Sequence, residues 1–68
     1  MMTKPETGEP KTFYIGFIGT SYFRPVIATS AKQAKQKFAA YEGMSRVSSS
    51  IVQKRSVDGA IEQMKPIV

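Results

Sequence analysis

The chain has no cysteine, histidine or tryptophan among its 68 residues, and it has only five acidic side chains. Without cysteine it forms no disulfide, and without cysteine and histidine the usual zinc and haem ligands are missing. The same absences remove the most common general bases and nucleophiles of enzymes. We therefore expect a non-enzymatic protein with no catalytic residues, no metal and no cofactor.

Long apolar runs are also absent. No stretch approaches the roughly 18 residues that a membrane-crossing helix needs, and residues 1–10 contain no apolar segment like that of a secretory signal. With the lack of cysteine, this predicts a cytoplasmic protein without a membrane partner. A chain of 68 residues makes one small domain that buries little surface alone, so we expect a homo-oligomer such as a homodimer.

Acidic residues are scarcest where basic residues are most frequent. Residues 11–57 contain eight Lys or Arg and a single acid, Glu42, which gives this stretch a formal charge of +7, against +5 for the whole chain. A body this positive attracts polyanions, because phosphates release condensed counterions when Lys and Arg neutralise them. The charge predicts a nucleic acid or an acidic protein as partner.

The chain divides into a tail, one domain and a short end. Residues 1–11 lack apolar periodicity and predict a flexible tail, residues 12–65 form the domain, and residues 66–68 are the C-terminal end. Aromatic and β-branched residues dominate 12–18 and 22–29, which predicts a β-hairpin turning at 19–21. Pro25 cannot donate to a ladder, so we expect the second strand at a sheet edge or a bulge.

The hairpin register is inferred from how each pairing sorts the side chains, since a slip of one residue moves them to the other face. A three-residue loop pairs Phe17 with Phe23. This pairing places the following apolar side chains together on one face of the hairpin: Phe13, Ile15, Phe17, Phe23 and Ile27. A two- or four-residue loop instead places Arg24 beside Phe17 on the core side. We therefore expect the three-residue loop, with Gly19 or a neighbour in the left-handed conformation.

A helix is predicted over residues 31–41. Ser30 and Gln33 match a capping box, in which their side chains satisfy free N–H groups of the first turn. The apolar residues that recur at helical spacing, and so face the sheet, are Ala31, Ala34, Phe38 and Tyr41. Gly43 is expected to end the helix, with Met44 making the apolar contact beyond it.

Residues 50–56 predict a third strand, residues 57–59 a turn, and residues 60–65 either a short helix or a short strand that Pro66 ends. A right-handed crossover returns the third strand beside the first, in the spatial order second, first, third. The predicted fold class is a small α+β, ββαβ unit. Its helix covers one sheet face and leaves the other face uncovered.

The uncovered face is the predicted binding surface. In the expected register it carries Tyr14, Tyr22 and Arg24, and aromatic rings stack on unpaired bases while Arg and Lys contact phosphates. Further phosphate contacts are expected from Lys32, Lys35, Arg46, Lys54 and Arg55. Two simpler interpretations stay open: the tyrosines reflect β-propensity on a surface packed against another subunit, and the helix lysines form a solvated face.

Two functions follow as hypotheses. The first is a small nucleic-acid-binding protein, for DNA or RNA, of the kind that phages or plasmids encode. The alternative is a protein-interaction module, such as an adaptor, linker or inhibitor, whose basic surface binds an acidic protein. The serine-rich loop at residues 45–50 resembles phosphate-binding loops only in composition, because it has no glycine-rich cradle and no Walker lysine.

Overall fold

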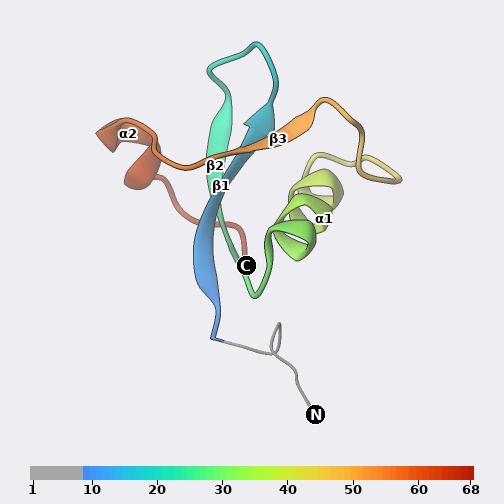
Figure 1. Cartoon of the computed structure of the whole chain (residues 1–68), viewed down its shortest axis with the longest axis horizontal. Helices are drawn as coiled ribbons and strands as arrows, with labels where there is room; N and C mark the ends of the chain where they lie inside the picture. The colour runs from blue at the N-terminus through green and yellow to red at the C-terminus, as the bar shows by residue number, and fades with distance from the viewer. Residues whose placement is uncertain (1–8) are drawn as a thin grey trace.

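The structure is a computed structural model that describes residues 9–68. Its elements follow the order β1 (Lys11–Phe17), β2 (Phe23–Ala28), α1 (Ala31–Tyr41), β3 (Ile51–Lys54) and α2 (Gly59–Glu62) (Figure 1). The strands form one sheet in the order β2-β1-β3, and β2 and β3 both run antiparallel to β1. The predicted α+β class and strand order are confirmed. The flexibility predicted for residues 1–8 lies outside the described residues, and Lys11, assigned to the tail, begins β1.

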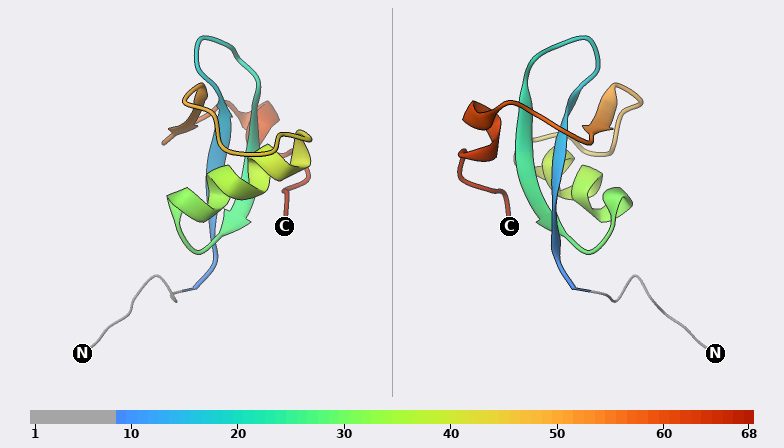
Figure 2. Two further views of the ribbon diagram at one scale, coloured as in Figure 1. Left: turned by 90° about the vertical axis from the view of Figure 1, so that its right-hand side faces the viewer. Right: turned by 60° about the vertical axis from the view of Figure 1, so that its left-hand side comes forward.

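The core lies between α1 and one face of the sheet (Figure 2). Its side chains are at most 9% exposed and are those of Ile15, Val26, Ala28, Ala34, Phe38, Ala39, Ile51 and Ile67. Each large member contributes about 1.5–3 kcal/mol by leaving water. Tyr41, which helical spacing predicted for this face, is 55% exposed, so that prediction is wrong. Neither helix of residues 9–68 has the length and apolar character that crossing a membrane requires.

The C-terminal end of α1 forms as predicted, whereas only the Ser30 half of the predicted capping box forms at its N-terminal end. The Ser30 hydroxyl accepts a hydrogen bond from the Gln33 N–H at 3.1 Å. The Gln33 side chain accepts from the backbone N–H of Thr29, one residue before the position that a capping box uses. At the other end Gly43 has a φ of 79°, and the Met44 N–H donates to the carbonyl of Ala39. This bond and the packing of Met44 on the core complete a Schellman motif.

The hairpin register differs from the prediction by one residue. Gly16, not Phe17, lies opposite Phe23, and the Phe17 N–H donates to the Tyr22 carbonyl at 3.3 Å, so the loop between this bonded pair contains four residues, 18–21. Thr20 holds this loop closed. Its N–H donates to the Phe17 carbonyl at 3.2 Å, and its hydroxyl oxygen accepts from the Tyr22 N–H at 3.1 Å. The positive φ expected at Gly19 is confirmed at 78°.

This slip exchanges the two faces of β2. Val26 and Ala28 pack under the helix, while Phe23 and Ile27, predicted for that side, lie on the opposite face. Arg24 comes to the helix side, opposite Ile15. It avoids the core because β2 is an edge strand, so its long side chain extends outward to the end of α1, where its guanidinium lies over the Tyr41 ring.

The second sheet face is not uncovered, contrary to the prediction. Phe23 on that face is only 3% exposed and Pro25 is fully buried. The chain leaving β3 crosses the sheet to α2, which packs against β2 on the side away from α1 (Figure 2). Of the two forms predicted for residues 60–65, the short helix is the one observed, and it ends at Glu62.

The C-terminal segment occupies the outer edge of β2. Ile67 forms a parallel bridge with Val26: its N–H donates to the Pro25 carbonyl at 2.9 Å, and its carbonyl accepts from the Ile27 N–H at 2.8 Å. The ring nitrogen of Pro25 faces this same outer edge, so the N–H that proline lacks is not required for a hydrogen bond to β1. The edge position predicted for the second strand is therefore confirmed.

Candidate polyanion-binding surface

The residues predicted to bind nucleic acid fall into three separate regions. Lys32, Lys35 and Arg46 belong to α1 and the loop after it, Tyr22 and Arg24 lie beside the C-terminal end of α1, and Tyr14, Lys54 and Arg55 belong to the other face and the end of β3. The shared sheet surface predicted for Tyr14, Tyr22 and Arg24 is wrong. The one-residue register shift places Tyr14 on the face opposite to the other two.

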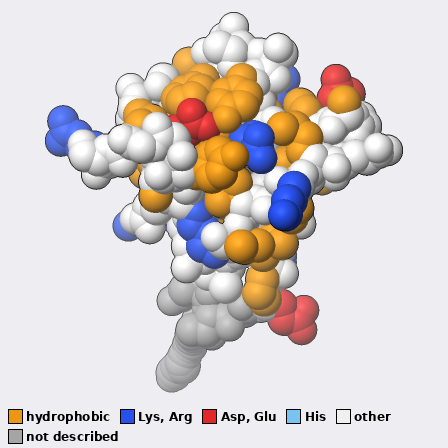
Figure 3. Space-filling model, turned by 180° about the vertical axis from the view of Figure 1, so that it is seen from behind, with side chains coloured by type: hydrophobic (Ala, Val, Ile, Leu, Met, Phe, Trp, Pro, Cys, Tyr) orange, Lys and Arg blue, Asp and Glu red, His pale blue; other side chains and the backbone are white. Residues whose placement is uncertain are grey.

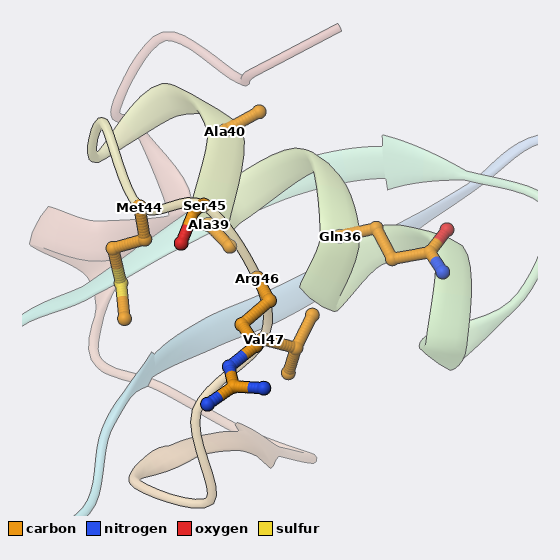
Figure 4. Close-up of a pocket in the computed structure, with 7 residues that line it drawn as sticks. All are labelled: Gln36, Ala39, Ala40, Met44, Ser45, Arg46 and Val47. Carbon is orange, nitrogen blue, oxygen red and sulfur yellow. The ribbon is translucent and has the colours of Figure 1, made fainter.

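The first region surrounds a hollow of about 410 Å³ between α1 and the loop that follows it. It is lined by Gln36, Ala39, Ala40, Met44, Ser45, Arg46 and Val47 (Figure 4). Figure 4 shows Gln36 and Ala40 on the helix and Arg46 and Val47 on the loop that runs back beside it. A second hollow along the same loop is lined by residues 44–49. Among the described residues that line the two hollows there is no Asp or Glu.

Two lysines extend this region along the helix. Lys32 and Lys35 precede the lining residues Gln36 and Ala39 by four positions, so each lies one helical turn away on the same side of α1. Lys32 and Arg46 are exposed and Lys35 is half-buried. We call Lys32, Lys35 and Arg46 the basic strip. Three cations beside an acid-free hollow form a surface of positive potential that water can reach.

The serine-rich loop shapes this surface through bonds of its own. The hydroxyls of Ser48 and Ser50 bond to each other at 2.7 Å, and the Ser50 N–H donates to the Ser48 hydroxyl oxygen at 3.0 Å. The Ser50 carbonyl in turn accepts from the N–H of Ile18, which ties the loop to the hairpin. These two serines therefore hold the loop in position beside the helix, and Arg46 is its charged group.

The second region is an aromatic and charged cluster at the C-terminal end of α1. The Tyr22 hydroxyl donates to the Glu42 carboxylate at 2.5 Å. This hydrogen bond, followed by partial burial and the negative charge of Glu42, raises the pKa of Tyr22 above its ordinary value of 10.0. The guanidinium of Arg24 lies 4.9 Å from the centre of the Tyr41 ring, within the range of a cation–π contact. Figure 3 shows a face on which hydrophobic side chains gather around basic and acidic groups.

The third region lies on the sheet face away from α1. Tyr14 is half-buried and sits directly across from Lys54 on β3. The Lys54 ammonium lies 4.8 Å from the centre of the Phe23 ring, so this lysine covers an apolar side chain. Arg55 is exposed in the segment that leaves β3. Lys54 therefore lies on the opposite side of the sheet from α1, which carries two residues of the basic strip.

Sequence reasoning missed Tyr41, Glu42 and Lys65 as partners of Tyr22 and Arg24. Tyr41 was assigned to the core because it continues the helical spacing, and Lys65 is 41 positions away from the arginine that bonds its carbonyl. One local signal was present. Tyr41 and Glu42 are the last residues before the Gly43 stop, where a helix commonly extends beyond the element that it covers.

Among residues 9–68 no group of three or more potential ligands from His, Cys, Asp and Glu is placed to hold a metal ion. The chain was also compared with known proteins. No family model, curated protein or solved structure matches it. The geometry and charge of the surfaces described above are therefore what indicates a function.

Proposed function

We propose that this chain is a small, non-enzymatic nucleic-acid-binding protein that contacts the phosphate backbone through its basic strip. The observation that carries the proposal is that Arg46 lines a hollow with no Asp or Glu in its described lining, while Lys32 and Lys35 lie one helical turn from two of its other lining residues. Each contact with a phosphate releases condensed counterions, and this release supplies most of the free energy of non-specific binding. The positive charge of residues 11–57 adds long-range attraction.

The mode of binding that we propose is backbone contact rather than base stacking. Stacking on a sheet needs several rings on one accessible face. Tyr14 and Tyr22 lie on opposite faces, and the Tyr22 ring packs 6.0 Å from the rings of Phe17 and Phe38. Lysine and arginine on a helix and loop need no such platform. We therefore expect little discrimination between sequences.

A pair of charge-matched variants tests the proposal. The strip variant is Lys32→Gln/Lys35→Gln/Arg46→Gln, and the control is Lys11→Gln/Lys54→Gln/Arg55→Gln, whose residues are exposed on other parts of the surface. Each lowers the formal net charge from +5 to +2. The affinity for a mixed-sequence oligonucleotide, single- or double-stranded, is measured by fluorescence anisotropy across a salt series.

The strip variant should lose at least about tenfold in affinity. The slope of its log K against the logarithm of the salt concentration should become shallower by about 2–3. The control variant should lose clearly less affinity, because it keeps the phosphate contacts of the basic strip and changes only the electrostatic potential of other parts of the surface. Equal losses in the two variants would mean that bulk charge alone is responsible. No binding at low salt would reject the proposal in favour of a protein-interaction module.

One observation favours that second function. The cluster of Tyr22, Arg24 and Tyr41 is partly exposed at the C-terminal end of α1, and aromatic residues and arginine are enriched at the centres of protein interfaces. This surface is separate from the basic strip, so the two functions do not compete for the same residues. The groups around Arg24 indicate which kind of partner this cluster would bind.

A further inference from the structure

A third hollow lies between the end of α1 and the C-terminal segment. Its volume is about 330 Å³, and it is lined by Arg24, Tyr41, Lys65, Pro66, Ile67 and Val68. Val68 is 85% exposed and Tyr41 is 55% exposed, so apolar and aromatic surface remains in water here. The lining combines aliphatic side chains with two cations and, among the described residues, includes no Asp or Glu side chain.

Arg24 is the charged group of this hollow that is held in place. Its guanidinium lies against the Tyr41 ring, and its Nη2 donates to the Lys65 carbonyl at 3.4 Å, a long hydrogen bond. Its Nε is buried and has no hydrogen-bond partner among the described residues. The nearby carboxylate of Glu42 accepts from Tyr22. Arg24 is therefore oriented, while most of its donors have no strong acceptor.

We infer that this hollow binds an acidic segment of a partner protein, with a carboxylate at Arg24 and an aliphatic side chain against Ile67 and Val68. An arginine whose plane is fixed by an aromatic ring presents its terminal N–H groups in the geometry that suits a carboxylate. Lys65 adds positive charge at the rim. The apolar part of the lining excludes water from the contact, which strengthens a charge-assisted hydrogen bond.

The same features disfavour a nucleic acid at this place. The Arg24 guanidinium covers a face of Tyr41, so that face is not free to stack on a base. Glu42 follows Tyr41 directly and carries a negative charge that a row of phosphates would meet. A peptide instead brings one carboxylate to Arg24 and neutral apolar groups to the rest of the hollow. The inference is independent of the basic strip and goes beyond the function proposed for it.

A matched pair of peptides tests the inference on the full chain. The ¹⁵N-labelled protein is titrated with acetyl-Leu-Glu-Leu-amide and, separately, with acetyl-Leu-Gln-Leu-amide. The resonances followed are the Nε–H of Arg24 and the backbone amides of Tyr41, Ile67 and Val68. The acidic peptide should shift these signals saturably with a dissociation constant of about 1 mM. The Gln peptide should bind about tenfold more weakly, since it lacks the charge.

Two variants complete the design. Arg24→Gln should reduce the affinity for the acidic peptide about tenfold, to that of the Gln peptide. The strip variant Lys32→Gln/Lys35→Gln/Arg46→Gln should leave it within about twofold, because none of these residues lines the hollow. The peptide comparison is made on unchanged protein, so it remains decisive if Arg24→Gln unfolds the chain.

Four results would overturn the inference. The first is equal affinity for the two peptides, and the second is a set of shifts confined to the basic strip. The third is an oligonucleotide that shifts the four followed residues at lower concentration than the acidic peptide does, which would assign the hollow to nucleic acid. The fourth is a dependence of these shifts on protein concentration without peptide, which would assign it to a second copy of the chain.

Discussion

Gly16 determines how the hairpin packs, because it leaves room for a neighbouring ring. A Cβ added at this position would lie 2.6 Å from Cγ and 2.7 Å from Cδ2 of Phe23, and it would also collide with the carbonyl oxygen of Tyr22. A glycine in a strand normally weakens it, but an aromatic side chain from the adjacent strand covers the exposed backbone and compensates. The buried position of Phe23 therefore depends on the absent side chain.

We predict that Gly16→Ala destabilises the protein by about 2–3 kcal/mol, because a backbone oxygen and a packed ring must both move. Urea unfolding followed by circular dichroism measures this. In a Phe23→Leu background the same substitution should cost less, since part of the collision is already removed. An unchanged unfolding midpoint for Gly16→Ala would contradict the packing described here.

Single residues also explain why the hairpin register was predicted wrongly. The prediction sorted side chains by polarity and rejected any register that put Arg24 on the core side. In the structure Arg24 occupies that side at the sheet edge, where it lies over the Tyr41 ring and donates to the Lys65 carbonyl. The pairing of Gly16 with Phe23 was the signal for the four-residue loop, because an aromatic residue opposite a glycine is a recurrent cross-strand arrangement.

Among the elements, α1 was predicted best because its ends are set by neighbouring residues. Ser30 and Gly43 act within a few positions of the groups that they satisfy. The strands depend on partners far along the chain. The third strand was expected over residues 50–56 but ends at Lys54, where pairing with β1 stops. Local signals therefore fixed the helix, whereas strand length and register required knowledge of the packing.

The C-terminal end of α1 allows a matched test of the left-handed cap. Gly43→Ala should destabilise the protein by about 1–2 kcal/mol, because a side chain at a φ of 79° is strained although space is open around it. Gly59→Ala is the control. Gly59 also has open space but no left-handed φ, and it begins α2.

The control should therefore be neutral or stabilising by up to about 1 kcal/mol. Thermal unfolding of the two variants side by side gives the comparison. Equal losses at the two glycines would show that the conformation of Gly43 is not what ends the helix.

At the scale of the whole molecule, the charge of the body was predictable and its distribution was not. Counting residues gives the excess of Lys and Arg, but the sequence does not say which of them share a side. The structure separates the basic strip from Lys54, which covers Phe23, and from Arg24, which lies on Tyr41. The covering of the second sheet face by α2 was equally hidden, because it depends on where a short C-terminal segment packs.

This excess of positive charge should oppose folding at low ionic strength. Folding brings the cations of residues 11–57 together while a single acid, Glu42, lies among them, so screening by salt should favour the folded state. Raising NaCl from about 20 to about 200 mM shortens the Debye length from roughly 20 to roughly 7 Å. We expect the melting temperature to rise by about 2–4 °C, which corresponds to about 0.5 kcal/mol for a domain of this size. The strip variant Lys32→Gln/Lys35→Gln/Arg46→Gln should show a smaller rise, and a melting temperature that falls with salt would mean that attractive charge pairs dominate instead.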